Sequence, residues 1–227
     1  DWLPNDRFGC SVGIEGDWLI VGAENEDHDT LGGNNLTNAG SAYIFKHDTG
    51  ETWIPTQKIN ASIRSILARF GTSVSIDSNT IAIGSTGDQY DEFGANWLDG
   101  NGAVFIYTLD TFTGIWSESQ KIVASDRIAH GYFGNQVFLD GNYLMVGAPQ
   151  EDRDGAGANI LADAGAVYIF EYNGSSWVEV QKIVASDRDI TDYFGGRISV
   201  DKNYMAIGAK WEDENDLGLD SIDNAGS

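Results

Sequence analysis

The sequence is poor in cysteine, in proline and in basic residues. Cys10 is its single cysteine, so no internal disulfide framework can form. Only 13 Lys and Arg residues face 35 Asp and Glu residues, which gives 227 residues a formal net charge of −22. This charge repels nucleic acids and anionic membrane surfaces, so we expect neither as a partner. No apolar run approaches about 18 residues, which excludes insertion of a helix into a bilayer.

The composition is nevertheless that of a folded protein. Hydrophobic residues make up 41% of the chain and aromatic residues 11%, more than an acidic disordered segment contains. The length is sufficient to bury a core. The chain opens at Asp1 with neither an initiator methionine nor a basic-then-apolar leader, and we therefore expect a processed form or a piece of a longer protein.

The chain is a repeat with a period of about 62 residues, which is typical of a solenoid or a propeller. Phe-Gly pairs mark the period, and two further glycines follow each pair at fixed spacing. We read residues 1–227 as a single domain of four units, the last of them incomplete. The units run over residues 7–68, 69–131, 132–192 and 193–227. The Phe-Gly pairs are Phe8-Gly9, Phe70-Gly71, Phe133-Gly134 and Phe194-Gly195.

Each complete unit reads as four short strands. The first alternates apolar and polar residues from the Phe-Gly pair, and a two-residue polar turn such as Gly141-Asn142 leads into the second. The second is apolar throughout, as in Tyr143 to Val146, which is typical of a strand covered on both faces. The third is apolar, and the fourth carries a tryptophan and a Gln-Lys-Ile triplet. The pattern predicts an all-β fold, a β-propeller of four-stranded blades with about three and a half blades present.

These motifs resemble a known family. A Phe-Gly pair that opens one strand and Val-Gly-Ala-Pro (Val146 to Pro149) that closes the next are similar to the FG-GAP repeat of integrin α-subunits and of many microbial surface proteins. The resemblance covers essentially the whole chain. It implies a seven-bladed propeller, of which this chain is an incomplete stretch, packed against the remaining blades or neighbouring chains. It also implies a secreted or cell-surface, non-enzymatic module for adhesion or protein recognition.

Acidic residues concentrate in the loops that follow the second strand of each unit. These four loops (residues 22–40, 84–102, 147–165 and 208–226) carry a net charge of −16. Because antiparallel strands alternate in direction, all four lie on one face of a propeller, which we call the acidic loop face. Carboxylates, a glycine bend and a side-chain carbonyl are what a calcium shell requires. The predicted calcium ligands are Glu26, Asp27, Asp29, Asn34, Asp88, Asp91, Asn96, Glu151, Asp152, Asp154, Asn159, Glu212, Asp213, Asn215 and Asp220.

Two other interpretations of these loops stay open. Asp, Asn and Gly are ordinary turn formers, and surface acid is often only solvated. Arg64, Arg127 and Arg188 recur on connections that share this face and can pair with the carboxylates. The resemblance also places the calcium motif of integrin-type repeats between the first and second strands, where this chain has only a two-residue turn. By the same resemblance, the acidic loop face corresponds to the ligand-binding face of integrin propellers.

Aromatic residues suggest an alternative ligand. Trp97 and Trp211 lie in the acidic loops, where an exposed ring beside carboxylates can stack on a sugar or simply pack within its loop. A protein or a glycan ligand on the acidic loop face is therefore expected. An architectural subunit of a larger surface assembly is a third hypothesis. The tryptophans of the fourth strands are expected to cover the blade edge; they are Trp53, Trp116 and Trp177.

Catalysis finds little support in the sequence. Its three histidines, His28, His47 and His130, occupy unrelated positions of the repeat, and Cys10 is expected in the core rather than as a nucleophile. We therefore do not expect an enzyme. Three Asn-x-Ser/Thr sequons are candidate glycosylation sites if the protein is secreted from a eukaryotic cell; they are Asn35, Asn60 and Asn173.

Overall fold

The computed structural model describes residues 4–213, and these form strands, turns and loops throughout. The part of the chain that it describes contains no helix able to cross a membrane. The strands are β1 (Phe8–Glu15), β2 (Trp18–Ala23), β3 (Ser41–His47), β4 (Trp53–Ile59), β5 (Phe70–Asp77), β6 (Thr80–Ser85), β7 (Ala103–Asp110), β8 (Ile115–Ile122), β9 (Gln136–Asp140), β10 (Tyr143–Ala148), β11 (Ala166–Tyr172), β12 (Trp177–Ile183), β13 (Phe194–Asp201) and β14 (Tyr204–Ala209).

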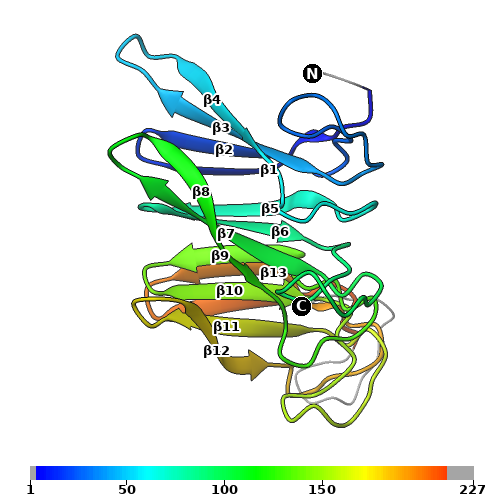
Figure 1. Cartoon of the computed structure of the whole chain (residues 1–227). Coiled ribbons are helices and arrows are strands. Elements are labelled where there is room, and N and C mark those ends of the chain that lie inside the picture. The colour runs from blue at the N-terminus through cyan, green and yellow to red at the C-terminus, as the bar shows by residue number, and fades with distance from the viewer. Residues whose placement is uncertain (1–3, 214–227) are drawn as a thin grey trace.

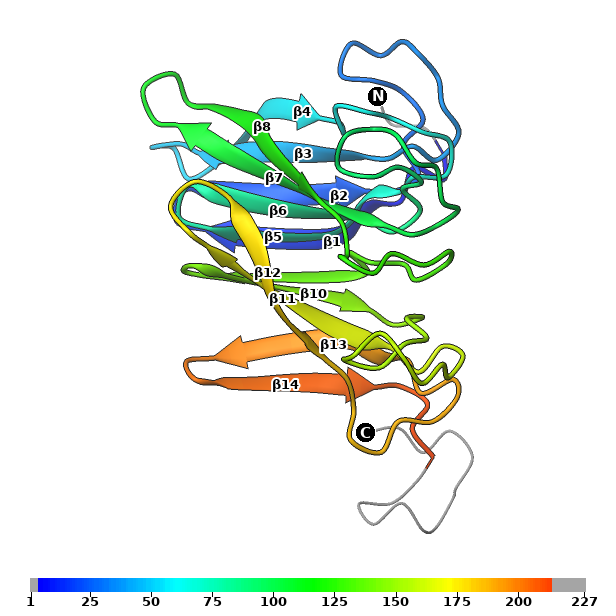
Figure 2. The same ribbon diagram turned by 60° about the horizontal axis from the view of Figure 1, so that its bottom comes forward.

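The strands pair in chain order into antiparallel sheets, one for each unit of the repeat. Blade 1 is β1-β2-β3-β4, blade 2 is β5-β6-β7-β8, blade 3 is β9-β10-β11-β12, and blade 4 consists of β13-β14 within the described residues. The blades stack face to face in chain order and do not close into a ring (Figure 1). In Figure 2 the fourth blade lies at the opposite end of the stack from the first. The predicted all-β fold of four-stranded propeller blades is confirmed.

Two-residue turns join the first and second strands of every blade. Gly16 and Gly141 have φ values of 53° and 56°, and the non-glycine residues Ser78 and Lys202 adopt 53° and 55°. These positive values fit the primed turns that match the twist of a hairpin. The first strand of the third unit differs from expectation. It begins at Gln136 rather than at the Phe-Gly pair, where Phe133 forms an isolated bridge to Gly102 of blade 2.

Close backbone contacts join consecutive blades at the glycines of the repeat. The Phe-Gly glycine of each following blade has a φ between 89° and 94°, and its carbonyl oxygen points at a second-strand glycine of the blade before it. A Cβ on Gly84 would overlap the carbonyl oxygen of Gly134, and one on Gly22 would overlap that of Gly71. Ser73 Oγ donates a hydrogen bond of 2.8 Å to the same Gly134 oxygen. Only glycine fits these positions.

The hydrophobic core lies between the blades. One cluster joins blades 1 and 2 through residues such as Ile44 and Phe105, a second joins blades 2 and 3, and a smaller one joins blades 3 and 4. Cys10 lies in a strand as predicted, but it is exposed and not in the core. The expectation for its burial was wrong because its Sγ, which lies 3.3 Å from the carbonyl oxygen of Gly71 in blade 2, lines an open pocket between the inner strands of the blades.

The outer strands of neighbouring blades are held by glutamine side chains. Gln57 Nε2 donates to the carbonyl oxygen of Trp116 at 2.8 Å, and Gln57 Oε1 accepts from the Trp116 amide at 3.1 Å. Gln120 and Trp177 repeat both bonds at 2.9 Å and 2.8 Å. Trp116 and Trp177 are buried, whereas Trp53 is 36% exposed. The expectation that these rings cover the blade edge was wrong for the two buried ones, which pack under the preceding blade.

Replacing Gly84 with alanine is expected to destabilise the protein by about 3 kcal/mol, because the new Cβ meets a main-chain oxygen that cannot move alone. Gly155→Ala is the matched control, since a Cβ there lies 3.6 Å from its nearest neighbour, the carbonyl oxygen of Lys182. Urea unfolding of both variants and the parent measures the difference. Equal stabilities of the two variants would contradict the proposed junction.

Candidate functional site

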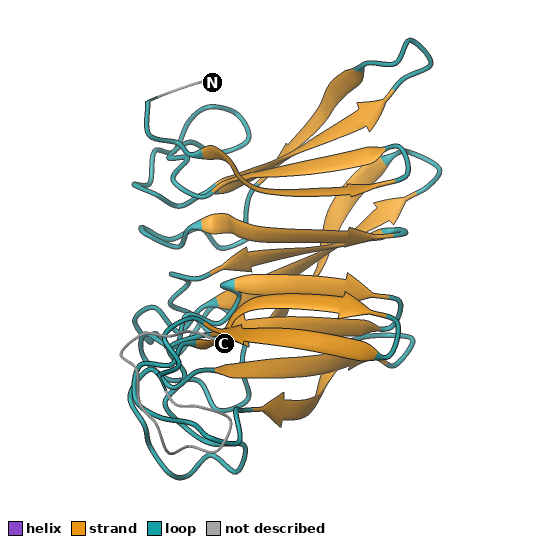
Figure 3. Ribbon diagram, turned by 180° about the vertical axis from the view of Figure 1, so that it is seen from behind, coloured by secondary structure: helices purple, strands orange, loops and turns teal. Residues whose placement is uncertain are grey.

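The acidic loop face lies at one end of the strands. The loops that follow β2, β6 and β10 project there together with the connections between blades, while the hairpins lie at the other end (Figure 3). The predicted grouping of these loops on one face is what the structure shows for the described residues.

In each of these three loops, the acidic residue four positions after the second-strand glycine, which we call the first acidic position, is buried and faces a lysine. Lys121 Nζ lies 2.8 Å from Asp88 Oδ1, and Lys182 Nζ lies 3.0 Å from Glu151 Oε1. In blade 1 the corresponding distance from Lys58 to Glu26 is 3.6 Å. Each lysine comes from the Gln-Lys-Ile triplet of the same blade. These ion pairs tie the start of the loop to the outer strand.

An aromatic ring of the third strand lies beneath each lysine. The ammonium groups of Lys58 and Lys182 lie 5.5 Å and 5.1 Å from the ring centres of Tyr43 and Tyr168. Blade 2 has Phe105 at this position, and its lysine lies 5.3 Å from that ring. Such cation–π contacts add to the ion pairs in a partly desolvated site.

Where blade 1 has a tyrosine hydroxyl that hydrogen-bonds to the loop carboxylate, blade 2 has a phenylalanine that cannot. Tyr43 donates to Glu26 Oε2 at 2.9 Å, but Phe105 has no hydroxyl, and Asp88 Oδ2 is buried without a hydrogen-bond partner. Burial therefore raises the pKa of Asp88 above its ordinary value, although Lys121 opposes this shift. Blade 2 contains the least compensated carboxylate of the three loops.

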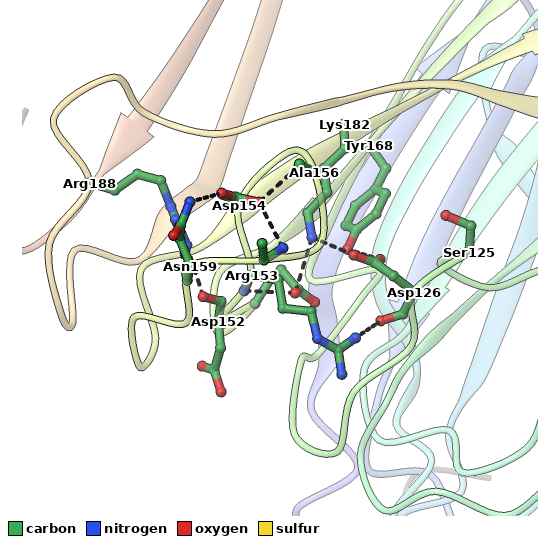
Figure 4. Close-up of polar contacts among 12 residues, drawn as sticks. Ser125, Asp126, Asp152, Arg153, Asp154, Ala156, Asn159, Tyr168, Lys182 and Arg188 are labelled. Carbon is green, nitrogen blue, oxygen red and sulfur yellow. Dashed lines mark hydrogen bonds and ion pairs between the residues drawn. The ribbon is translucent and has the colours of Figure 1, made fainter.

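Blade 3 adds a second carboxylate to this cluster (Figure 4). Asp126 accepts from Tyr168 and from Lys182, both at 2.7 Å. Burial alone would raise the pKa of Asp126, but these two bonds outweigh it and lower the pKa below its ordinary value. Burial raises the pKa of Glu151, which shares Lys182 with Asp126. Lys182 thus forms ion pairs with two carboxylates, Asp126 and Glu151.

The aspartate three residues after the first acidic position, which we call the third position, closes a turn in each loop. Asp91 Oδ1 accepts from the amides of Phe93 and Ala95 at 3.0 Å and 2.8 Å, and Asp91 Oδ2 accepts from the Asn96 side chain. Asp29 and Asp154 make the same three kinds of bond within their own loops. Hydrogen bonds from backbone amides lower the pKa of all three aspartates, the charged form being favoured.

The residue directly after the first acidic position, which we call the second position, links the two ends of its loop. Asp27 Oδ1 accepts from the Asn38 amide at 2.7 Å, and Asp152 Oδ1 accepts from the Asp163 amide at 2.9 Å. Gln89 replaces the acid in blade 2 and donates to Asp99 at 3.3 Å.

The three recurring arginines bind the loops through main-chain oxygens. Arg64 donates to the carbonyl oxygens of Asn34 and Asp27, both at 2.7 Å, and Arg188 donates to those of Asn159 and Asp152 at 3.3 Å and 2.9 Å. Arg127 reaches the carbonyl oxygen of Asn96 at 3.0 Å. The arginines thus brace the loop backbone, and their charges also help to lower the pKa values of Asp29, Asp91 and Asp154, as the expected pairing with carboxylates implies.

The predicted calcium ligands do not converge among the described residues. No group of three or more His, Cys, Asp or Glu side chains within residues 4–213 is arranged to hold a metal ion. The carboxylates described above already accept hydrogen bonds, so the donor set there does not fit a calcium shell. Glu212 is buried and Asp213 half-buried, while Asn215 and Asp220 lie outside the described residues. Calcium binding stays a prediction.

Comparison with known families decides the class of the chain. The model of the FG-GAP repeat matches residues 1–45, 116–170 and 177–222, which together exceed half of the chain. The chain belongs to the FG-GAP repeat family. Blade 2 falls largely outside the matched segments, although its strands, junctions and loop repeat those of the other FG-GAP blades.

Other comparisons add little to the FG-GAP assignment. A search of curated proteins finds no match. Among solved structures, the chain is similar to the crystal structure of the Saccharomyces cerevisiae Sqt1, with 10% sequence identity and a TM-score of 0.44. The alignment covers 84% of this chain and 38% of the yeast chain, so the FG-GAP chain spans less than half of that protein's length.

Apolar side chains project from the FG-GAP loops, and the sequence interpretation missed most of them. Leu31, Phe93, Trp97 and Ile160 are 93%, 82%, 60% and 73% exposed. Of the two tryptophans predicted to bind a ligand, Trp97 is open. Trp211 is 40% exposed and packs against Tyr193, with ring centres 4.8 Å apart. The missed signal was an apolar residue beside each acidic turn.

The sequons differ in accessibility. Asn35 and Asn173 are exposed, the first in an acidic loop and the second in the β11–β12 hairpin. Asn60 is half-buried, and its Nδ2 donates to the carbonyl oxygen of Gly40 at 3.0 Å and to Ser41 Oγ at 2.7 Å. A glycan on Asn60 would disturb these bonds. Glycosylation of all three stays a prediction.

Lys121→Met is expected to destabilise the FG-GAP chain by about 3–5 kcal/mol at neutral pH, because it leaves the Asp88 carboxylate buried and unpaired. The loss should shrink as the pH falls, since protonation of Asp88 removes the charge. Denaturant unfolding at several pH values measures both effects. The control is Lys46→Met on an exposed lysine. A pH-independent loss, or no recovery in a Lys121→Met/Asp88→Leu double variant, would contradict this account.

Proposed function

We propose that the acidic loop face is the binding surface of an extracellular, non-enzymatic module for adhesion or protein recognition. One observation carries the proposal: apolar side chains, Leu31, Phe93, Trp97 and Ile160, stand exposed on loops whose backbones are fixed internally. Membership of the FG-GAP family supports it, because FG-GAP propellers serve as protein-recognition modules. The integrin-like and cell-surface aspects rest on the resemblance of the motifs.

Fixed loops favour binding because little conformational freedom is lost when a partner arrives. The turns closed by Asp29, Asp91 and Asp154 and the braces from the arginines set the loop backbones before any ligand is present. Exposed rings and aliphatic side chains on such a frame are typical anchors of an interface. The negative charge around them selects a partner whose own surface is basic.

The histidines support a non-enzymatic role. His28 Nδ1 lies 3.0 Å from Glu26, His47 packs on Trp53 with ring centres 5.0 Å apart, and His130 Nε2 lies 3.8 Å from Asp99. They lie in different structural settings, each with a local partner, and no nucleophile accompanies them in these contacts. The FG-GAP family is generally non-enzymatic, which is consistent with this arrangement.

A carbohydrate ligand is the second candidate, and Trp97 is the observation that favours it. Its ring is 60% exposed in a loop that also carries Asp99 and Asn96. An aromatic face beside amide and carboxylate groups can stack on a sugar and hydrogen-bond to its hydroxyls. Trp211 contributes less, since its ring already packs on Tyr193.

Binding to an array of extracellular proteins, with a glycan array in parallel, distinguishes these candidates. A Phe93→Asp/Trp97→Ala variant is expected to lose at least about tenfold in affinity for a protein ligand, because anchors at the centre of an interface dominate its energy. Phe112→Asp is the matched control, being a fully exposed aromatic (97%) in the β7–β8 hairpin at the opposite end. Binding confined to glycans and abolished by Trp97→Ala supports the carbohydrate candidate. Equal losses in the control and the loop variant refute both.

Calcium assistance is tested by a thermal melt after chelation, with and without added calcium. The geometry of the described loops predicts an unchanged Tm, because their carboxylates already accept hydrogen bonds from amides or pair with lysines. A rise in Tm that saturates with calcium and is not matched by equal magnesium would show that the folded protein binds the ion. In that case recognition would have to be measured with calcium present.

A further inference from the structure

A groove opens between blades 2 and 3 at the hairpin end of the strands, opposite the acidic loop face (Figure 3). We call it the hairpin groove. The β5–β6 and β9–β10 turns, the outer strands of blade 2 and the β11–β12 hairpin line it. Its volume is about 540 Å³, within the range of about 300–1,000 Å³ that ligand pockets occupy. Both of its walls are complete four-stranded blades.

The hairpin groove is open because a small residue stands where blade 1 has a tryptophan. Thr80 and Trp18 hold the same register position, at the start of the second strand of their blades. Trp18 packs edge-to-face on Trp116 of blade 2, with ring centres 5.5 Å apart. Thr80 is too short to reach Trp177 of blade 3 in the same way, and both residues line the groove. The space that an indole ring fills at one junction is therefore open at the next.

An aromatic ring is exposed on the wall that blade 3 provides. Tyr172 lines the groove and is 38% exposed, and its ring packs on that of Trp177 with ring centres 5.4 Å apart. Blade 2 has Leu109 at the corresponding register position, opposite Trp116. The tyrosine thus presents a flat apolar face that is supported from beneath and carries a hydroxyl at its edge, which suits a ligand with both apolar and polar groups.

Polar groups surround the ring, and the carboxylate among them is held in place. Asp77 Oδ2 accepts a hydrogen bond of 2.6 Å from the amide of Gly141, and Asp77 Oδ1 accepts one of 2.9 Å from the hydroxyl of Ser78. These bonds fix the carboxylate across the junction and leave it further lone pairs for the hydroxyl groups of a ligand. Thr108 and Asn142 add a hydroxyl and an amide to the lining. A site fixed in this way loses little conformational freedom on binding.

The charge of the groove narrows the class of ligand. Asp77 is the only charged residue among those that line it, and none of them is a lysine, an arginine or a histidine. A phosphate, a sulfate or an acidic sugar would therefore meet a negative charge and no cation. A single carboxylate that already accepts two hydrogen bonds also offers little to a metal ion, which requires several oxygen ligands. Hydroxyl and amide groups around an open aromatic face match a neutral sugar.

We propose that the hairpin groove binds a neutral sugar, a mono- or disaccharide unit of a larger glycan or a free oligosaccharide. The apolar face of the sugar ring stacks on Tyr172, and its hydroxyl groups bond to Asp77, Thr108 and Asn142. The groove lies at the opposite end of the strands from the acidic loop face. The proposal therefore does not depend on what that face binds.

Saturation-transfer NMR of the full chain tests the proposal with the methyl glycosides of glucose, galactose, mannose, fucose and N-acetylglucosamine. At least one of these neutral sugars should bind, and N-acetylneuraminic acid, the anionic comparison, should not. Thr80→Trp is expected to weaken the binding by at least about tenfold, because the new ring fills the groove as Trp18 fills the space at the preceding junction. Thr80→Ser keeps both the hydroxyl and the space, and as the matched control it should bind like the parent.

A second variant keeps the test valid if the first does not fold, which circular dichroism checks. Tyr172→Leu gives blade 3 the residue type that blade 2 has at this position, and it should weaken binding by a similar factor because leucine offers no flat ring. Trp97→Ala should leave the binding unchanged, which separates the hairpin groove from the carbohydrate candidate on the acidic loop face. A parent that binds none of the neutral sugars, binding that survives in both groove variants, or a loss confined to Trp97→Ala overturns the proposal.

Discussion

The stack depends on a main-chain contact at each blade junction. The carbonyl oxygen of a Phe-Gly glycine lies where a second-strand glycine of the preceding blade would carry its Cβ. The constraint falls on the backbone and not on a side chain, which explains why the rest of the motif varies. Gly-Ala-Pro at Gly147 becomes Gly-Ala-Glu at Gly22 and Gly-Ser-Thr at Gly84, and the junction survives in both. The outer position Gly40 obeys the same rule against Phe70.

The other contacts between blades follow from that approach and extend it outward. Once the inner strands are close, apolar faces bury each other, and at the outer strand a glutamine holds the backbone of the next tryptophan. Still further out, Ser62 donates to Glu118 through its amide and hydroxyl at 2.9 Å and 2.6 Å, and Ser125 does the same to Glu179. Blades fixed at both inner and outer strands give the loops a rigid base, which recognition requires.

The acidic composition of the loop face suggests a metal site, but most of the described carboxylates there have partners within the protein. Acids at the first position are held by lysines, and those at the third by the amides of their own turns. Most of the close acidic groups of the described loops therefore have partners within the protein itself. What remains to meet a partner is the negative field and the apolar side chains that the turns present, such as Phe93 and Trp97.

The interactions that could be predicted from the sequence are those within one unit of the repeat. The strands, the two-residue turns and the common face of the loops follow from alternation, turn chemistry and antiparallel order over a few residues. Contacts across a junction join residues about 60 positions apart, and no local pattern reports them. The burial of Trp116 cannot be predicted in this way, because its partner, Gln57, lies in another unit.

The exposure of Cys10 and the backbone contacts of the arginines escape sequence reasoning for the same reason. Because Cys10 lies in a predicted strand, the sequence favours the core for it, but its Sγ faces an open pocket that the inner strands of several blades form together. Charge alone pairs Arg64 with carboxylates, whereas loop closure gives the Asp29 carboxylate amide donors and turns loop carbonyl oxygens toward the guanidinium. In a stacked repeat, the role of a side chain is decided by which face of which blade covers it. A period identifies the blades, but only the junction geometry shows where each side chain is buried.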